Sequence, residues 1–404
     1  MTGRALICGG SIGGLFCAAM LRRAGWEAVV YERSRTELSG RGAGIVTHDL
    51  LNDLLRLAGA ATDDLGVQVT ERVAFDLAGN RVETILLPQI VTSWDRVHSL
   101  LRALMPEGTY QLGKAISRYD QDADHVTLRL EDGTTEQAEL LVGADGFRSA
   151  VRAQMHPLVQ PRYAGYVVWR ALAHEADLPS GIRDKVFDPF GFFLPTGTQI
   201  IGYPIAGPGN DLRPGHRRYN FVWYMPVAPE DLADMLTDGS GQRHEITIPP
   251  PLVRDAVLTR MQIFAKEHLP ALFLEVLDRS ERPFFTPIYD HLSPAFSEGR
   301  VALVGDAACV ARPHVGMGVT KAAGDAEALA RALTGAPVPE ALVRYSGERQ
   351  AASRIAHDTG QRLGGYIFAQ GTDSNLNGRS NPNIATIVAE TAVVPAALRS
   401  QGPT

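Results

Sequence analysis

The feature that most constrains this chain is a glycine-rich turn that lies between a strand pattern and a helix pattern near the N-terminus. Residues Arg4 to Cys8 form a short apolar run, and residues 9–14 read Gly-Gly-Ser-Ile-Gly-Gly. Leu15 to Ala24 then carry apolar residues at helical spacing, and a β pattern resumes at Glu27 to Tyr31. A strand, turn, helix and strand within about thirty residues match the size of a right-handed parallel crossover. The chain is therefore expected to begin with a parallel α/β sheet.

The turn has the features of a dinucleotide-binding turn. Its backbone N–H groups and the N-terminus of the following helix can hold a pyrophosphate, so Gly9, Ser11, Ile12 and Gly14 are candidate binding residues. Ser11 replaces a glycine of the usual pattern, and its hydroxyl can itself donate to a phosphate oxygen. Glu32 ends the second strand 23 positions after Gly9, where a carboxylate can accept from ribose hydroxyls. The alternative is a glycine turn without a nucleotide, and strand, turn, helix and acid together favour the nucleotide.

Two later segments repeat the pattern of a strand that ends in a glycine and an acid. Leu140 to Val142 runs into Gly143-Ala144-Asp145-Gly146, and Val301 to Val304 runs into Gly305-Asp306. The second acid is followed by a loop with Pro313 and by a helix around residues 321–333. An acid and a helix N-terminus at a strand end can direct polar groups at an anionic ring or a ribityl chain. Each segment alone is a weak signal, and the three in this order make a strong one.

Composition excludes several classes of protein. Hydrophobic residues make up 45% of the 404 residues and charged residues 21%, which fits a globular protein rather than a disordered or fibrous one. The net charge of −6 and the lack of a basic block argue against nucleic acid or an anionic membrane as partner. No apolar run reaches the ~18 residues of a membrane span. Cys8, Cys17 and Cys309 are scattered without a CxxC pair, which argues against a disulfide framework or a metal site and suits a reducing cytoplasm.

The middle of the chain differs from both ends. From about residue 161 to 283, aromatic residues concentrate, and prolines and glycines punctuate short β-rich runs. This pattern predicts a mostly antiparallel sheet in a second domain. Because the strand-like Val301 to Val304 comes after this region, the first domain is expected to close with late sequence. The tail from Thr372 is rich in Asn, Ser, Gly and Pro, and is expected to be a loose cover or arm.

Taken together, the segments around Gly9, Asp145 and Asp306 resemble the single-component FAD-dependent aromatic hydroxylases, the group typified by para-hydroxybenzoate hydroxylase. Within this group the chain most resembles the 2,6-dihydroxypyridine 3-hydroxylase branch, over about residues 4–335. The segments that carry this likeness are Leu38-Ser39-Gly40, Gly44-Ile45-Val46, Tyr163-Ala164-Gly165-Tyr166, Trp169-Arg170, Tyr203-Pro204-Ile205, Arg312-Pro313-His314, Lys321-Ala322 and Asp325-Ala326. The chain departs from the pattern at Cys309, where many relatives have a histidine, and at Thr320, where an asparagine is common.

The resemblance implies a fold class and a division into domains. The fold would be an α/β FAD-binding Rossmann-like domain of the glutathione-reductase type, joined to an α+β substrate domain built on a mostly antiparallel sheet. Residues 1–72, 92–160 and 283–345 would form the FAD-binding domain, and residues 73–91 and 161–282 the substrate domain. Residues 346–404 would form a C-terminal helix and a loose tail.

The resemblance also implies which residues hold FAD. Glu32 would bind the adenosine ribose, Arg96 the pyrophosphate and Asp306 the ribityl chain. Backbone amides around Gly316 to Thr320 would face N1 and O2 of the flavin, where a positive helix end suits the charge of the reduced ring. For Arg96 the alternative is an ordinary surface cation. The remaining residues expected at the cofactor are Arg33, Ile45, Asp145, Val315 and Val319.

For the reaction, the resemblance implies that NADH or NADPH reduces FAD, that O2 adds at flavin C4a, and that the hydroperoxide hydroxylates a small electron-rich aromatic ring. The ring would be a hydroxylated pyridine or a similar N-heterocycle. Loss of a hydroxyl proton makes such a ring a better nucleophile, so a nearby His or Tyr with a tuned pKa is useful. His314 is the first candidate, followed by Tyr203, Tyr224 and His48, and for each the alternative is a residue that only packs or lies on the surface.

Other functions use a similar cofactor site. A flavin dehydrogenase or oxidase would insert no oxygen, and a flavin redox sensor would need a partner surface or an appended module. A flavin halogenase is disfavoured because the chain lacks a Trp-x-Trp-x-Ile-Pro segment, the nearest being Trp223-Tyr224-Met225-Pro226. The sequence leaves open the substrate ring, the choice between NADH and NADPH, and the oligomeric state, for which a homodimer is one option.

Overall fold

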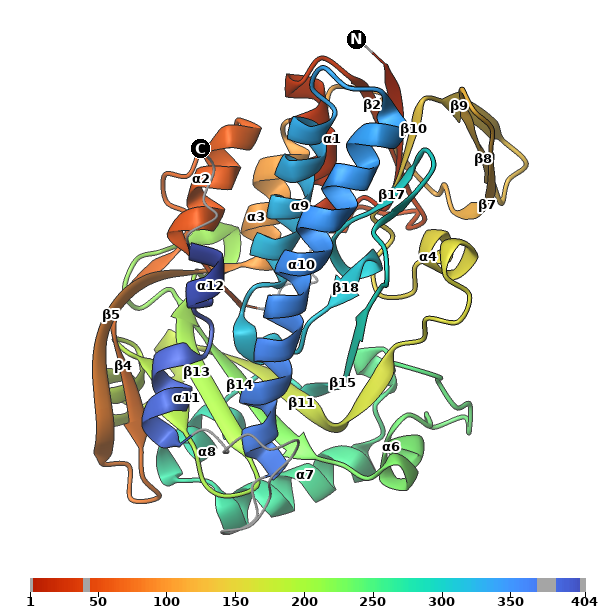
Figure 1. Cartoon of the computed structure of the whole chain (residues 1–404). Coiled ribbons are helices and arrows are strands. Elements are labelled where there is room, and N and C mark those ends of the chain that lie inside the picture. Colours follow the sequence, from red (N-terminus) through yellow and green to blue (C-terminus); the bar gives the residue numbers. More distant parts are fainter. Residues whose placement is uncertain (1–2, 39–43, 369–382, 400–404) are drawn as a thin grey trace.

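The computed structural model describes residues 3–38, 44–368 and 383–399. Figure 1 shows parallel strands and helices in its upper part, a larger sheet in its lower part, and one long helix, α10 (Val338–Gly364), that runs beside both. Near the C-terminus, α11 (Ile384–Glu390) packs against the larger sheet and α12 (Ala396–Arg399) against α10. Of the tail that was expected to be loose, residues 383–399 are described and are packed in this way, whereas residues 372–382 and 400–404 lie outside the described residues.

The first sheet has six strands, and β1 lies near its centre between β10 and β2. Five of its strands are parallel, and β16 pairs antiparallel with the edge strand β17. The predicted strand, turn, helix and strand at the N-terminus are confirmed as β1, α1 and β2. In order across the sheet, the strands are β16 (Ser297–Glu298), β17 (Val301–Leu303), β10 (Leu140–Gly143), β1 (Arg4–Cys8), β2 (Glu27–Glu32) and β6 (Tyr110–Leu112).

Helices cover one face of this sheet, and a small three-stranded sheet lies near the other. α1 packs against α9, α2 and α3, and α9 packs against α10. The sequence of residues 92–105 reads as a helix for which Ser93 is a candidate N-cap. The structure confirms this, because the side chain of Ser93 caps α3 by accepting from the N–H of Arg96. The small sheet consists of β7 (Ile116–Gln121), β8 (Val126–Leu130) and β9 (Thr135–Ala138). The other helices are α1 (Ile12–Arg23), α2 (Asp49–Ala58), α3 (Trp94–Arg102), α4 (Ala150–Met155), α5 (Ser180–Val186), α6 (Pro229–Met235), α7 (Asp255–His268), α8 (Ala271–Asp278) and α9 (Gly318–Ala332).

The second sheet has nine strands within the described residues. Its neighbouring strands pair antiparallel except for β12 and β4, which are parallel. In order across the sheet, the strands are β18 (Cys309–Val310), β15 (Phe284–Leu292), β11 (Arg162–His174), β14 (Arg218–Pro226), β13 (Gln199–Ile205), β12 (Phe190–Phe193), β4 (Val67–Phe75), β5 (Arg81–Ser93) and β3 (Gly44–Val46).

The strand pairings bear on the predicted division into domains. The expected boundary after residue 72 cuts through β4, and β3 also belongs to the nine-stranded sheet although it was assigned to the FAD-binding part. The composition of the chain changes only at about residue 161. It therefore does not reveal that the chain already enters the nine-stranded sheet at β3 and β4. We therefore propose that residues 44–46 and 67–93 are grouped with the substrate domain.

The central strands of the nine-stranded sheet are buried on both faces, and their successive residues alternate between two clusters of side chains. Trp223 lies in the cluster that α7 and α8 cover, and its neighbour Tyr224 lies in the opposite cluster, which includes residues of α10 and α11. This opposite face carries Tyr166, Val168, Phe190, Phe192, Tyr203 and Tyr224. The strand period of two thus places an aromatic wall on the face of the sheet opposite to α7 and α8.

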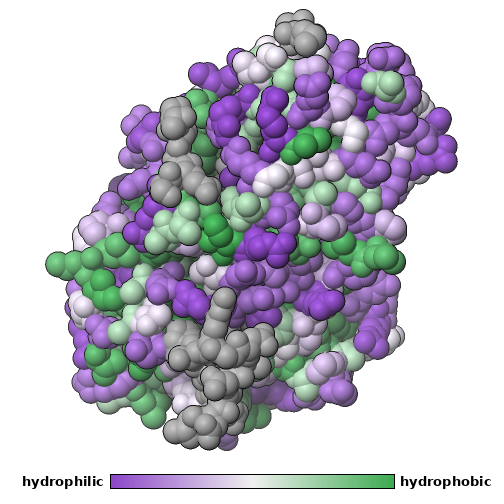
Figure 2. Space-filling model, in the orientation of Figure 1, coloured by the Kyte–Doolittle hydropathy of each residue, from purple (hydrophilic) through white to green (hydrophobic). Residues whose placement is uncertain are grey.

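The face of the molecule in Figure 2 is mostly hydrophilic. Apolar residues stand out at its left edge, where β5 lies in Figure 1, and Leu86 of that strand is 81% exposed. Across the described residues, no helix combines the length and the apolar character that a membrane span needs.

Candidate active site

A cavity of about 750 Å³ lies at the carboxyl ends of β1, β2 and β10. Ligands of α/β proteins bind at this edge of the sheet. The cavity also reaches the nine-stranded sheet, because Val168 and Arg170 of β11 and Thr286 of β15 line its other side. A ligand in it could therefore contact both parts of the molecule. Five of the predicted cofactor residues line the cavity: Gly9, Ser11, Glu32, Arg33 and Asp145.

The glycine turn is shaped by close contacts that exclude side chains. Gly9 has φ +111°, and a Cβ there would overlap the carbonyl oxygen of Ala144. A Cβ on Gly14 would overlap the carbonyl oxygen of Gly9. Ser11 precedes α1 without capping it, and Ile12 is buried as the first residue of the helix. The turn therefore leaves the Ser11 hydroxyl and the N–H groups at the start of α1 available to a ligand in the cavity.

Glu32 is buried at the rim of the same cavity. One carboxylate oxygen accepts from the N–H of Gly10 at 2.8 Å, and the other accepts from the N–H of Ser34 at 2.8 Å. A carboxylate has further lone pairs to offer, so these bonds orient the group and still allow it to accept from hydroxyls of a ligand. Its predicted role at the ribose stays a prediction.

Asp145 organises the turn that follows β10. Its carboxylate accepts from the hydroxyl of Ser149 at 2.5 Å and from the N–H of Ala150 at 2.7 Å, at the start of α4. Burial raises the pKa of the Asp145 carboxyl in spite of these hydrogen bonds. Arg152 of α4 donates to the carbonyl oxygens of Phe147, at 2.7 Å, and Ala307, at 3.3 Å, so it connects this turn to the one after β17.

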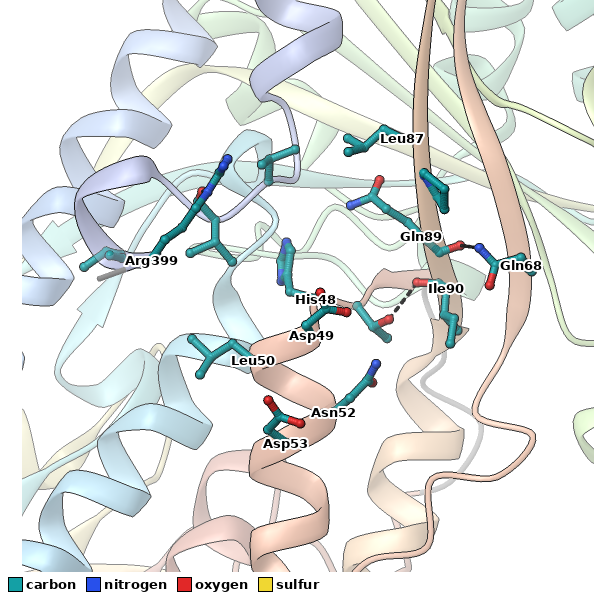
Figure 3. A pocket seen from close by; sticks show the side chains of 15 residues that line it. His48, Asp49, Leu50, Asn52, Asp53, Gln68, Leu87, Gln89, Ile90 and Arg399 are labelled. Carbon is teal, nitrogen blue, oxygen red and sulfur yellow. Dashed lines mark hydrogen bonds between the residues drawn. The ribbon is translucent and has the colours of Figure 1, made fainter. Parts of the chain in front are cut away.

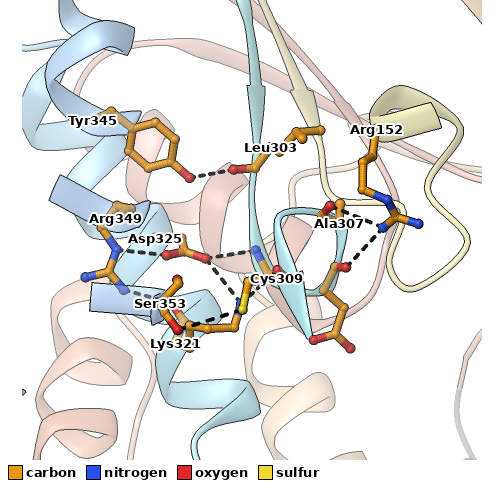
Figure 4. A network of polar contacts seen from close by, with 11 residues as sticks. Arg152, Leu303, Ala307, Cys309, Lys321, Asp325, Tyr345, Arg349 and Ser353 are labelled. Atoms are coloured by element: carbon orange, nitrogen blue, oxygen red, sulfur yellow. Dashed lines mark hydrogen bonds and ion pairs between the residues drawn. The ribbon is translucent and has the colours of Figure 1, made fainter. Parts of the chain in front are cut away.

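A buried ionic network holds the turn at Gly305 and Asp306 (Figure 4). Lys321 donates from Nζ to the carbonyl oxygen of Gly305 at 2.7 Å, and the N–H of Gly305 donates to Asp325 at 2.9 Å. Arg349 of α10 donates to the other oxygen of Asp325 at 2.8 Å. Buried charges persist when they are paired and hydrogen-bonded, as here. The network fixes the backbone on both sides of Gly305 and leaves the side chain of Asp306 exposed.

The loop that connects this turn to α9, residues 313–320 (loop 313–320), is largely buried. Gly316 has φ +64°, Val315 is buried, and Val319 is partly buried against the core of the first sheet, as is Ile45 of β3. Thr320 is buried, and its hydroxyl lies 3.1 Å from Nδ1 of His48. Loop 313–320 thus leads into the N-terminus of α9 close to the cavity, since Pro313 lines it.

Of the catalytic candidates, His314 and Tyr224 lie together. His314 is fully buried, its Nε2 is 3.0 Å from the hydroxyl of Tyr166, and its ring centre is 4.3 Å from that of Tyr224. Burial, together with the charge of Arg312, lowers the pKa of His314 to about 3. Its Nδ1 has no hydrogen-bond partner among the described residues. The imidazole is therefore neutral, with one ring nitrogen free.

Tyr203 lies on the same aromatic wall. Its ring stacks on Phe190 with 4.8 Å between centres, and burial raises the pKa of its hydroxyl. Burial also raises the pKa of Tyr224, to about 12. Arg170, which lines the cavity, carries the positive charge that acts on both hydroxyls. These tyrosines are protonated at neutral pH.

His48 and Arg96 lie away from this group. Nε2 of His48 is 3.2 Å from the carbonyl oxygen of Ala392, and burial lowers the pKa of His48 to about 4. Arg96 donates from Nη2 to the carbonyl oxygen of Asp63 at 3.1 Å and is not part of the cavity lining. Its role at a pyrophosphate stays a prediction.

Sequence reasoning missed several residues of this region. Tyr166, Arg170, Lys321 and Asp325 were noted only as part of a family likeness, and Arg152 was not singled out. The spacing of Lys321 and Asp325, four positions apart on a helix, was a usable signal of an ion pair. Nothing in the spacing showed that the pair would be buried. Within the described part of the chain no cluster of His, Cys, Asp or Glu could hold a metal ion.

Comparisons with known proteins agree with this geometry. The sequence model of the FAD binding domain family matches residues 3–179 and 285–359, and that of the FAD binding domain-like family matches residues 163–290. The chain is 35% identical to 2,6-dihydroxypyridine 3-monooxygenase of Paenarthrobacter nicotinovorans, over 82% of this chain and 83% of that protein. It is 30% identical to 3-amino-4-hydroxybenzoate 2-monooxygenase of Streptomyces cremeus, over 89% and 86%. The solved structure of 2,6-dihydroxypyridine-3-hydroxylase from Arthrobacter nicotinovorans superposes with a TM-score of 0.86 at 31% identity, over 93% of this chain and 95% of that one.

Proposed function

The chain belongs to the FAD binding domain family and, within it, to the FAD-dependent aromatic hydroxylases, and from this premise we propose that its substrate is a small hydroxylated pyridine or a similar N-heteroaromatic ring. The protein is an NAD(P)H-dependent flavoprotein monooxygenase that inserts one atom of O2 into an aromatic ring. The observation that carries the choice of substrate is the buried aromatic wall of Tyr166, Tyr203 and Tyr224, in which Tyr166 and Tyr224 contact a neutral His314. A flat ring with one or two polar groups suits such a wall better than a dicarboxylate.

The residues of the cavity fit FAD. The turn at Gly9 and Gly14 is packed too tightly for a Cβ, which holds it at the end of β1, and Ser11 and Glu32 both line the cavity there. Asp306 is held with its side chain exposed, where it could accept from a ribityl hydroxyl. When bound, FAD supplies the redox chemistry that joins NAD(P)H to O2. The protein has to bind the ring, exclude water and control the proton on the hydroxyl group of the ring.

We propose that His314 orients the substrate. A base with a pKa of about 3 removes protons poorly from a phenol-like hydroxyl, so the geometry favours a hydrogen bond from the free Nδ1 to the ring over proton abstraction. The hydroxyl of Tyr166 fixes the imidazole from the other side. Tyr224 and Tyr203, with raised pKa values, act as neutral donors and acceptors in the same wall.

The test is a screen of small aromatic compounds for substrate-stimulated NAD(P)H oxidation by the FAD-loaded protein. Hydroxypyridines, the corresponding phenols and unsubstituted pyridine form a matched series that separates the ring nitrogen from the hydroxyl. We expect the hydroxypyridines to stimulate oxidation most and the product to gain one oxygen by mass. Under labelled dioxygen the label should enter the product.

Two outcomes would change the proposal. A product without labelled oxygen would identify a dehydrogenase or oxidase. Hydroxylation of phenols in preference to all hydroxypyridines would keep the enzyme class and overturn the N-heteroaromatic substrate. Comparing NADH with NADPH in the same assay identifies the reductant.

We further propose a cytoplasmic location and a homodimer as the assembly to test. The three cysteines are free and buried, and none of them forms a disulfide, which supports a reducing compartment. Light scattering of the purified protein measures the mass of the assembly directly.

A further inference from the structure

Arg72 on β4 is a buried cation without an acidic partner. Its side chain is 0% exposed, and among the described residues no carboxylate lies at ion-pair distance from it. Burial lowers the pKa of Arg72 to about 9. A buried charge is costly unless hydrogen bonds compensate it. The position of the Arg72 guanidinium is therefore fixed by the groups that accept hydrogen bonds from it.

The partners of Arg72 are carbonyl oxygens of the segment that follows α11. Nη1 donates to Val388 at 2.8 Å and to Thr391 at 2.6 Å, and Nη2 donates to Ala392 at 3.3 Å. Nε and Nη2 also reach the side-chain oxygen of Gln89 on β5. All these acceptors are neutral, so the guanidinium holds residues 388–394 (the C-terminal segment) against β4 and β5.

The carbonyl oxygen of Ala392 is the centre of this arrangement. Besides Arg72, it accepts from Nε2 of Gln89 at 3.1 Å and lies 3.2 Å from Nε2 of His48. Figure 3 shows His48, at the start of α2, and Gln89, on β5, in the wall of one cavity of about 660 Å³ that the C-terminal segment also lines. Ala392 has φ +53°, a conformation that non-glycine residues seldom adopt. The hydrogen bonds therefore hold a strained backbone in place.

Ala392 contacts loop 313–320 directly. Its N–H donates to the carbonyl oxygen of His314 at 2.8 Å, and a Cβ on Gly316 would lie 2.6 Å from the Cα and Cβ of Ala392. At the other end of the loop, His48 connects the same carbonyl group to the hydroxyl of Thr320. The C-terminal segment thus contacts one end of the loop directly and the other end through His48, and the amides of this loop are expected to face the flavin.

We propose that the C-terminal segment is part of the flavin site and that Arg72 is its positioning residue, which sets the backbone of loop 313–320 through Ala392. The role concerns FAD and not the choice of ring, so it stands independently of the proposed substrate. It gives a reason for glycine at position 316, because the segment occupies the place of a side chain.

The test compares Arg72→Met with Arg81→Met. Arg81 lies on the same hairpin, is half-exposed and pairs with Glu71 at the surface. FAD is titrated into each apoprotein, and the visible circular dichroism of the bound flavin is recorded. We expect Arg72→Met to weaken FAD binding roughly tenfold or more and to change the flavin spectrum, because several hydrogen bonds to a charged group are lost. Arg81→Met should keep both properties of the wild type.

A purely structural role predicts a different result. In that case Arg72→Met would unfold at a lower temperature, but its folded fraction would bind FAD with wild-type affinity and spectrum, and the proposal would be overturned. Arg72→Lys should recover part of the affinity, since an ammonium can donate to the same carbonyl groups but lacks the planar fork.

A second pair of variants tests the segment without changing the buried charge, should Arg72→Met fail to fold. Ala392→Gly keeps the backbone hydrogen bonds and suits the positive φ, whereas Ala392→Val adds a β-branched side chain to a strained position against Gly316. We expect FAD affinity and flavin spectrum to be preserved in Ala392→Gly and impaired in Ala392→Val. Equal FAD binding by the two variants would show that the segment is not part of the flavin site.

Discussion

The glycine turn and loop 313–320 both reach the cavity of about 750 Å³, through Gly9 and Pro313, and they are built in different ways. At the glycine turn, Glu32 accepts from the N–H groups of Gly10 and Ser34, so these contacts lie within one stretch of the chain. At loop 313–320, the contacts join His314 to Tyr166 and Ala392, from segments far apart in the sequence. The comparison teaches that a local motif can identify the cofactor, whereas the side chains proposed to hold the ring are brought together only by the tertiary fold.

The largest expected effect is loss of FAD on substitution in the glycine turn, where backbone geometry determines the shape of the site. Gly9→Ala would place a Cβ on the carbonyl oxygen of Ala144 at a φ of +111°, and we expect the purified variant to retain no FAD. Gly79→Ala is the control, because Gly79 also has a positive φ, +79°, but no atom lies within 4 Å of its Cβ position. Flavin released on denaturation measures the effect. Full FAD content in Gly9→Ala would show that the turn does not hold the nucleotide.

The next largest effect tests loop 313–320. His314→Phe should lower the hydroxylation rate by ~10²-fold if the imidazole positions the ring, while FAD stays bound. NAD(P)H oxidation should then produce peroxide in place of product, because a poorly placed ring does not react in time. His216→Phe, with a half-exposed side chain in a surface loop, is the control. Unchanged coupling in His314→Phe would make this histidine a packing residue and direct the search to Tyr203, Tyr224 and His48.

Asp306, in the turn that follows β17, should give an intermediate effect. Its carboxylate is expected to accept from a ribityl hydroxyl, an interaction typically worth ~1.5–3 kcal/mol, so Asp306→Ala should weaken FAD binding by roughly 10- to 100-fold. Asp124→Ala, in an exposed turn before β8, serves as the control. Equal FAD affinity of the two variants would remove Asp306 from the cofactor site.

The same comparison explains what the sequence could predict. β1, α1, β2 and the cap at Ser93 follow from local patterns, and all of them are confirmed. The pairing of β12 with β4 joins residues more than a hundred positions apart, and no periodicity specifies such a pairing. The early crossing of β3 and β4 into the second sheet was missed for the same reason.

Buried polar residues were the least predictable part of the site. Arg72 occupies a strand whose pattern would equally suit a surface arginine, and three of its acceptors lie more than three hundred residues later. Lys321 and Asp325 have the spacing of an ordinary surface ion pair. Burial of these groups depends on packing of distant elements, and single-sequence patterns carry no information about it.

The smallest expected effect is on the pH dependence of stability. It distinguishes the buried His314 from the half-exposed His216. Burial lowers the pKa of His314 to about 3, whereas His216 is half-exposed. An unfolded chain binds a proton on each histidine below about pH 6.5, but the folded chain leaves His314 neutral until about pH 3. The unfolded state therefore gains protons first, and the free energy of unfolding falls as the pH drops through this window.

For His314 alone, this loss amounts to at most roughly 2 kcal/mol between pH 7 and pH 5. Urea unfolding at constant FAD excess, repeated across this range, measures the slope. His314→Phe should have a shallower pH dependence than the wild type, and His216→Phe should match the wild type. Groups elsewhere, including the buried His48 and His291, contribute alike to all three proteins, so the difference in slope isolates His314. Identical slopes in His314→Phe and the wild type would mean that the imidazole titrates normally in the fold, and an acid-base role in catalysis would then become the better explanation.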